Sequence, residues 1–428
     1  MPVTPPRPVS RPEGASVLAR WRAFRKDMFS SQPERLYRAR VAELKTPVYR
    51  SFTVPDPALA RQVLEDAEGF PKSDVLSATL GPLLGRSVFV TNGAEWGEAR
   101  ARIDPAFSGG RVREMAPQIE AAARTMCAGL SPGEVEVEAV TARATADVIL
   151  RVLFSRPIED AQAAEVYDAF RAYQRAQPLA SPADLLRLPR WVPRRRRGAA
   201  AARRLRALVA GLIAARTGEE DDLTARLVKA GFEGERLLDQ AVMFLLAGHE
   251  TSASALSWAL LCLALADEVQ ERAAVEALAA PEGFAGLRQM PFLRDVWREV
   301  LRLYPPVPML PRRAARPAQL RDREVAAGAA VILSPWHSGR HERVWDAPHV
   351  FDPDRWSRDV PSEAWFPFSA GPRICPGAGF ANTEGVLMLA ALLRHWRVAP
   401  VEGRMPRPVA HLTVRAADGI WLRFSERS

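Results

Sequence analysis

The sequence predicts a mainly α-helical fold with small β-sheets, of the α+β class. Three observations lead to this prediction. From Val112 to Thr217 the chain reads as successive helices. Residues 235–266 then form the longest helical pattern, which is apolar nearly all round. Residues 312–333 and 396–426 read instead as short strands with polar turns. The long helix is therefore expected at the centre of the core.

An apolar helix of this length is either a core helix or a membrane span. Asp239, His249 and Glu250 lie inside it, and a charge near the middle of a span costs at least about 2.5 kcal/mol. We therefore expect a buried helix of a soluble protein. Gly248 and Thr251 lie mid-helix, where a glycine costs about 1 kcal/mol relative to alanine and a threonine hydroxyl can bond the preceding turn. Either a simple bend or a groove facing a reactive centre would follow.

Composition limits the class of protein. The chain has 428 residues, 48% of them hydrophobic and 25% charged, which are globular values. Its 3 cysteines are odd in number and widely spaced, which argues against a disulfide framework and for a reducing compartment. Residues 1–15 are rich in proline and lack the apolar segment of a signal peptide or membrane anchor. We expect an extended tail ahead of a single domain over 16–428, in a cytoplasmic protein.

The net charge of +9 favours an acidic partner, anionic lipid or nucleic acid. The densest basic run, Arg194–Arg197, has no interleaved aromatic residues and no nucleic-acid motif. We therefore expect a solvated face there and no nucleic-acid binding.

Other stretches predict local structure around a pocket. Residues 48–54 alternate as a strand does, and Asp56 is placed to cap a following helix. Residues 71–92 read as a loop-rich, mostly uncharged wall of an apolar pocket. The proline-rich connection over 178–198 is either a lid or an ordinary long loop. Segments 165–195, 305–310 and 409–414 complete the expected pocket.

A loop near the C-terminus carries the strongest chemical signal. Cys375 lies among glycines and prolines directly before a helical pattern, where free backbone N–H groups and the helix dipole favour a thiolate. Gly371 and Gly377 lack a Cβ, so that a flat group can lie close to the backbone. Arg373 can reach an anionic group at its edge. The alternative is a buried free cysteine in a turn.

This loop resembles a known signature. Phe368, Gly371, Arg373, Cys375 and Gly377 reproduce the Phe-x-x-Gly-x-Arg-x-Cys-x-Gly haem-binding signature of the cytochrome P450 superfamily. The resemblance implies the cytochrome P450 fold, with haem b between the long central helix and the helix after the cysteine loop. It implies Cys375 as the axial ligand of the haem iron, and Phe368, Arg373 and Gly377 as further cofactor-binding residues.

The long helix contains a second match. Residues 247–251 resemble the oxygen-activating Ala-Gly-x-Asp/Glu-Thr motif of the same superfamily. The resemblance places Ala247 at the haem and makes Thr251 and Glu250 catalytic. Thr251 is expected to help to deliver protons during oxygen activation, and Glu250 to link it to solvent.

Two further sets of residues resemble the family. Trp96 and Arg100 share one helix face and can both donate to a carboxylate; in the family such a pair binds a haem propionate. Arg312 matches the arginine that reaches the other propionate, although Arg313 is adjacent. A buried structural network of the Glu-Arg-Arg type is implied for three residues: Glu299, Arg302 and Arg355.

The resemblance implies a soluble, bacterial-type haem-thiolate monooxygenase that uses O2. It would oxidise a hydrophobic molecule such as a lipid, a terpenoid or carotenoid, or another secondary metabolite. Met243, Phe244, Ala247 and residues 307–310 offer apolar surface. No flavin or iron–sulfur sequence is appended, so we expect a separate ferredoxin or flavodoxin, docking near Cys375. Peroxide-driven peroxygenation, a haem-binding sensor or carrier, and a helical scaffold without a cofactor are the alternatives.

Overall fold

The computed structural model describes residues 3–14, 16–24, 26–45, 50–176, 198–358 and 360–427. The run Arg194–Arg197 and the connection expected over 178–198, except Gly198, lie outside these residues. Most of the described chain is helical, as expected. The helices are α1 Val17–Phe24, α2 Pro57–Glu65, α3 Asp74–Leu84, α4 Gly93–Ile103, α5 Gly109–Ala128, α6 Val137–Phe154, α7 Ala161–Ala176, α9 Ala199–Ala214, α10 Leu223–Lys229, α11 Gly234–Leu265, α12 Asp267–Ala279, α13 Pro291–Leu303, α14 Pro335–Ser338 and α15 Ala378–His395.

The strands form small sheets. The largest has the order β1-β2-β7-β4, in which β2 and β7 are parallel and the outer pairs antiparallel. The others are β3-β11-β8, β10-β9 and β5-β6. The strands are β1 Ala42–Lys45, β2 Arg50–Val54, β3 Gly133–Glu136, β4 Leu310–Arg313, β5 Ala318–Leu320, β6 Arg323–Val325, β7 Ala330–Leu333, β8 Trp396–Pro400, β9 Pro408–Ala410, β10 Val414–Ala416 and β11 Trp421–Glu426.

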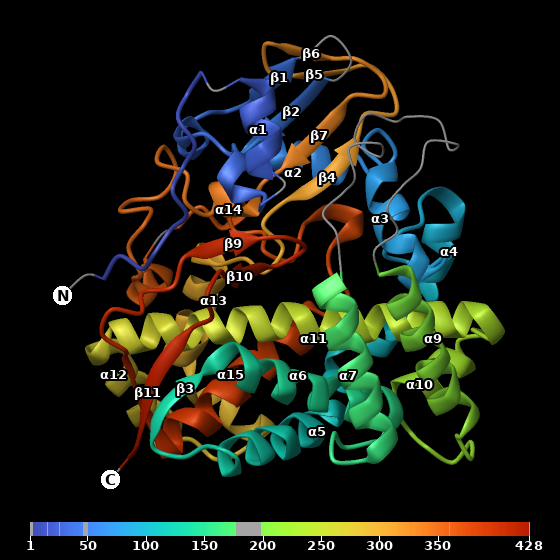
Figure 1. Ribbon diagram of the computed structural model, residues 1–428, viewed down its shortest axis with the longest axis vertical. Helices are drawn as coiled ribbons and strands as arrows, with labels where there is room; N and C mark the ends of the chain where they lie inside the picture. The colour runs from blue at the N-terminus through green and yellow to red at the C-terminus, as the bar shows by residue number, and fades with distance from the viewer. Residues whose placement is uncertain are drawn as a thin grey trace.

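Helix α11 crosses the middle of the molecule, with the sheet β1-β2-β7-β4 on one side and α5, α6, α7 and α15 on the other (Figure 1). Most of its 32 residues are buried. A Cβ on Gly248 would lie 2.8 Å from the Cδ1 of Ile149 on α6. The glycine therefore lets α6 and α11 approach each other closely. This packing gives a reason for the mid-helix glycine that the sequence did not reveal.

Local signals explain other helix starts. The carboxylate of Asp56 accepts from the Leu59 N–H at 3.1 Å, so the predicted N-cap of α2 is confirmed. The prediction of a loop-rich stretch over 71–92 was wrong for its centre, which forms α3. Ser73 caps that helix, and Leu80 and Leu83 bury its inner face. Burial of leucines thus outweighs Gly81 and Pro82 near its end.

The proline-rich N-terminal residues lie extended against the rest of the chain. The Arg11 N–H donates to the Gln32 carbonyl at 2.9 Å, and the buried Tyr304 hydroxyl donates to the Pro6 carbonyl. Val3 forms an isolated β-bridge with Phe351. The tail therefore contributes contacts to the fold. The division of the chain into a tail over 1–15 and a single domain over 16–428 stays a prediction.

In the part of the chain that the structure covers, no single helix has both the length and the apolar character needed to cross a bilayer. Among the helices that the structure describes, only α11 and α12 taken together meet these criteria, and they are bent by 114° at their junction.

Candidate active site

A cavity of about 1740 Å³ extends from α11 and the cysteine loop to the N-terminal region. It is larger than ordinary ligand pockets of about 300–1,000 Å³. The predicted apolar residues line it, as do parts of segments 71–92, 305–310 and 409–414. The lining side chains expected from the sequence are Met243, Phe244, Ala247, Val307, Met309 and Leu310.

Cys375 faces this cavity from the loop before α15. Its N–H donates to the Phe368 carbonyl at 2.9 Å, which fixes the loop, and Gly377 is the N-cap of α15. The surrounding protein raises the pKa of the Cys375 thiol by burial, against smaller opposing effects of the Gly377 N–H and the Arg100 charge. Cys375 is nevertheless exposed toward the cavity. A metal cation at the sulfur would favour its thiolate form.

The two glycines of this loop have different roles. Gly371 has φ of +64°, and a Cβ there would lie 2.6 Å from the Leu64 carbonyl oxygen of α2. It makes room for the α2 backbone, and its expected role beside a flat ligand stays a prediction. A Cβ on Gly377 would lie 3.9 Å from the Cys375 sulfur and from Phe107. Gly377 thus borders the open space beside the sulfur.

Four cations and a tryptophan line the same cavity: Lys72, Trp96, Arg100, Arg312 and Arg373. The Arg373 guanidinium lies 4.7 Å from the centre of the Trp96 ring and donates to Asn92 Oδ1 at 2.7 Å. Arg312 is buried and donates to the Pro311 carbonyl at 3.2 Å. The structure therefore brings together residues from α4, β4 and the cysteine loop, as predicted. Arg313, the adjacent candidate, pairs instead with Asp74 at 3.5 Å.

This cluster carries more positive than negative charge. Within the described residues, the carboxylate of Asp104, which pairs with Arg100, is the only one bound to these four cations. Burial and the charges of Arg373, Arg312 and Arg100 lower the pKa of Lys72 to about 6. Burial and Arg373 lower the pKa of Arg312 to about 10. Both shifts show a site that would be stabilised by an anion.

Sequence reasoning missed Lys72. Its amine donates to the carbonyls of Val88 and Thr91, at 2.5 and 3.3 Å, and lies 5.9 Å from the Trp96 ring centre. A lysine at the start of an apolar stretch was the available signal. Nothing in the sequence placed it beside Arg312 and Arg373.

The helix motif presents its polar side chains to the cavity. The Thr251 hydroxyl donates to the Ala247 carbonyl at 2.7 Å, as predicted. Glu250 is buried, and its Oε1 accepts from Thr413 and Arg415, each at 2.9 Å. Its Oε2 has no partner among the described residues. Arg415 is 34% exposed and therefore connects Glu250 to solvent.

A second buried acid lies behind this motif and was also missed. Glu384 on α15 accepts from the hydroxyl of Ser252, the residue after Thr251. Burial raises the pKa of Glu384 to about 8, against the opposing effect of Ser252. Its other oxygen has no partner in the part of the chain that the structure describes. The available signal was a lone carboxylate in the apolar pattern of α15.

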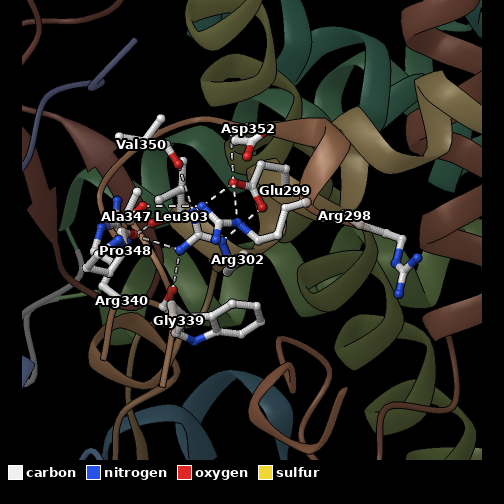
Figure 2. Close-up of polar contacts among 12 residues, drawn as sticks. Arg298, Glu299, Arg302, Leu303, Gly339, Arg340, Ala347, Pro348, Val350 and Asp352 are labelled. Carbon is white, nitrogen blue, oxygen red and sulfur yellow. Dashed lines mark hydrogen bonds and ion pairs between the residues drawn. The ribbon is translucent and has the colours of Figure 1, made fainter. Parts of the chain in front are cut away.

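Figure 2 shows the hydrogen bonds around Arg302. The side chain of Arg298 points away from them. The guanidinium of Arg302 donates to both oxygens of Glu299, at 2.9 and 2.7 Å. It also donates to three backbone carbonyls, those of Gly339, Pro348 and Val350. Arg355 donates to Glu299 at 3.3 Å. The predicted contacts among Glu299, Arg302 and Arg355 are thus present.

The residues present fit a haem group. A single thiol faces the cavity, the walls are apolar, and a cation cluster lacking anions suits two propionates. No group of three or more His, Cys, Asp and Glu residues with metal-binding geometry occurs in the described ranges. A metal bound here would therefore bring most of its ligands with it, as haem iron does.

Comparisons with known proteins agree with this geometry. The family model described as Cytochrome P450 matches residues 40–422. Cyclooctat-9-en-7-ol 5-monooxygenase of Streptomyces melanosporofaciens is 30% identical, over 85% of this chain and 83% of that protein. Cyclooctatin synthase of the same organism is 31% identical, over 84% and 83%.

The fold is similar to that of solved structures. A 6-coordinated cytochrome P450 from Thermus thermophilus has a TM-score of 0.72 and 27% identity, covering 91% of this chain and 95% of its own. The sequence motifs, the fold and the span of the family match lead to one conclusion. The chain belongs to the cytochrome P450 family.

Proposed function

We propose that this monooxygenase carries haem b and oxidises a hydrophobic, terpenoid-type molecule, with electrons from a separate ferredoxin or flavodoxin. The observation that supports it best is a single cysteine thiol facing an apolar cavity beside four cations. When bound, the haem would activate O2 for insertion into a C–H bond. The cytoplasmic location stays a prediction.

The haem would be held by residues from several elements. We assign the iron to Cys375 as a thiolate, flanked by Phe368 and Gly377. Ala247 would contact the haem from α11, the helix that also carries Thr251. The propionates would be bound by the cation cluster, which comprises Lys72, Trp96, Arg100, Arg312 and Arg373.

Thr251 and Glu250 are the proposed proton-delivering residues. The Thr251 hydroxyl can donate one proton and accept another hydrogen bond, so that it can pass a proton between a water and a ligand in the cavity. Glu250 has an unpartnered Oε2, and its partner Arg415 reaches solvent. Glu250 would pass protons to Thr251 from water that enters beside the exposed Arg415, which itself keeps its proton. Thr251→Ala should keep reductant consumption but lower product formed per electron pair, whereas Thr251→Ser should restore coupling.

The substrate class is inferred from the apolar walls and from the two Streptomyces relatives. Their names specify oxidation of cyclooctat-9-en-7-ol and synthesis of cyclooctatin. The cavity of about 1740 Å³ has room for a bulky hydrocarbon beside the haem. A terpenoid-type substrate is thus favoured.

The electron donor is inferred from charge. A net charge of +9 would attract an acidic ferredoxin or flavodoxin. We expect the rate of reduction to fall as ionic strength rises. A rate independent of salt would exclude this docking mode.

An absorption spectrum of the reduced protein with carbon monoxide tests the proposal at its base. Thiolate-bound haem should give a strongly red-shifted Soret band, which Cys375→Ser should lose. Cys127→Ser is the matched control, because Cys127 is a free thiol that does not line the cavity. No haem, or a band typical of histidine ligation in both proteins, would overturn the proposal.

A further inference from the structure

One part of the cavity wall carries polar side chains and is formed by elements other than those that carry Cys375 and the cation cluster. It is formed by α1 and by residues 31–36, next to the sheet β1-β2-β7-β4 (Figure 1). Phe24 and Met28 supply apolar surface there. The polar side chains that line this part are Arg20, Ser31, Gln32 and Arg35.

Arg35 is the side chain on which the inference depends. It is half-buried, and its Nε is buried without a hydrogen-bond partner among the described residues. Nor does it form an ion pair with any carboxylate that the structure describes. Arg50, which lines the same cavity, pairs by contrast with Glu43 at 2.6 Å. A buried donor of an ionised group that stays unpaired is costly, so an anion bound at Arg35 would be stabilised.

The N-terminal tail adds positive charge behind this wall. Arg11 is 8% exposed, and its side chain donates to the carbonyls of Ser31 and Pro12, at 3.1 and 2.9 Å. These bonds hold the Arg11 charge next to Ser31 and Gln32, which line the cavity. Burial, and next the charges of Arg20 and Arg35, lower the pKa of Arg11, against a smaller opposing effect of Glu13. Arg20 and Arg35 therefore both lie within electrostatic reach of Arg11.

We propose that Arg35, supported by Arg20 and Arg11, is an anion-binding site in the substrate cavity. It would take the carboxylate or phosphate group of an amphipathic substrate, whose hydrocarbon body lies along the apolar walls. A guanidinium binds either group by paired hydrogen bonds. The inference rests on the proposed function, and it defines the substrate class further: a hydrocarbon with an anionic end.

Ligand binding to the haem-loaded protein tests this inference. Dodecanoate, dodecyl phosphate and dodecan-1-ol share one chain and differ in head group. Their dissociation constants are measured from the Soret shift and, independently of the haem, by calorimetry. We expect at least one anionic ligand to bind about tenfold more tightly than the alcohol. The tighter of the two identifies the head group as carboxylate or phosphate.

Variants test whether Arg35 causes the preference for an anionic ligand over dodecan-1-ol. Arg35→Gln should remove it while leaving the affinity for dodecan-1-ol unchanged, and Arg35→Lys should keep part of it. Arg50→Gln is the matched control, because Arg50 lines the cavity but is already paired. It should retain the wild-type preference.

Equal affinities of the wild type for all three ligands would overturn the inference without any variant. So would a preference that Arg35→Gln retains. A protein that lacks the thiolate-haem band but prefers the anion by calorimetry, and loses this preference in Arg35→Gln, would refute the proposed function and leave this site standing.

Discussion

Arg302 and Arg312 are both buried arginines, but their surroundings differ. Arg302 donates to both oxygens of Glu299 and to three backbone carbonyls (Figure 2). Arg312 donates to one carbonyl, that of Pro311, and lies close to the charge of Arg373. The first charge is neutralised inside the protein, whereas the second is not.

The difference separates structural charges from charges that serve a ligand. A buried ion pair with all its hydrogen bonds holds segments together, and removing one partner leaves the other charge unpaired. A buried cation without an anion is a cost to the fold unless a ligand neutralises it. The Arg302 network joins α13 to residues 339–352. The cation cluster that contains Arg312 would instead be stabilised by a bound anion.

The largest effect is expected from Arg302→Leu. It would leave Glu299 buried with only Arg355 and the Asp352 N–H as partners, which costs about 3–5 kcal/mol of unfolding free energy. Urea unfolding measures this loss. Arg423→Leu is the control, since Arg423 is 62% exposed and pairs with Glu134 at 3.2 Å. It should cost less than about 1 kcal/mol. Similar losses of unfolding free energy in both variants would show that the buried Arg302 network contributes no more than an exposed ion pair.

Arg312→Leu should behave in the opposite way. The haem-free protein should unfold at the same or a higher urea concentration, because an unpaired buried cation is removed. Haem should leave about 10–100-fold faster, which corresponds to about 1.4–2.8 kcal/mol. Transfer of haem to an apoglobin measures this rate. Arg313→Leu is the adjacent control and should change it little, since Arg313 pairs with Asp74. A faster release from that variant instead would reassign the role to Arg313.

Glu384 represents a third case, a buried acid that avoids its charge by staying protonated. Its pKa of about 8 lies above the value near 4.5 expected in the unfolded chain. Between these values the folded state binds the extra proton, so stability falls as pH rises from about 4.5 to about 8.

The glutamine in Glu384→Gln cannot ionise. The stability of this variant should therefore not fall in this way as pH rises. A single pKa unit is worth about 1.4 kcal/mol, and we expect the variant to gain at least that much over the wild type between pH 5 and pH 8. Thermal unfolding across this range measures the gain. Glu402→Gln, an exposed position, should show no such trend. Parallel curves for wild type and Glu384→Gln would show that Glu384 is ionised in the folded state.

The smallest effect is expected from Asp104→Asn. It removes the one carboxylate bound to the cation cluster, through Arg100. An ion pair of this spacing on a helix is worth about 0.3–0.5 kcal/mol, so the haem-free protein should be slightly less stable. Haem release should become slightly slower, because Arg100 is freed for the ligand. A faster release would indicate that Asp104 orients Arg100.

The sequence predicted those features that are local in the chain. The cysteine loop and the 247–251 motif each occupy a few consecutive residues, and the apolar pattern of α11 extends over about nine turns of helix. Glu299 and Arg302 are three apart on one helix, so their pairing also follows from spacing. Such features require no knowledge of the tertiary fold.

Features that depend on distant contacts were not predicted. Lys72 joins the cluster only because β4 and the cysteine loop pack beside it. Glu384 meets Ser252 across 132 residues of chain. The role of Gly371 depends on the backbone of α2, which no spacing reveals. Tertiary packing also turned the centre of 71–92 into a helix, by burying its leucines.

The contacts of the N-terminal tail have a consequence for the order of folding. The Pro6 carbonyl receives its hydrogen bond from Tyr304, which is 298 residues further along the chain, and Val3 pairs with Phe351. The tail is therefore synthesised well before the partners that it contacts. Long-range contacts of this kind form slowly, because a large loop has to close first. Docking of the tail is thus expected among the last steps of folding, after the helical core around α11 has formed.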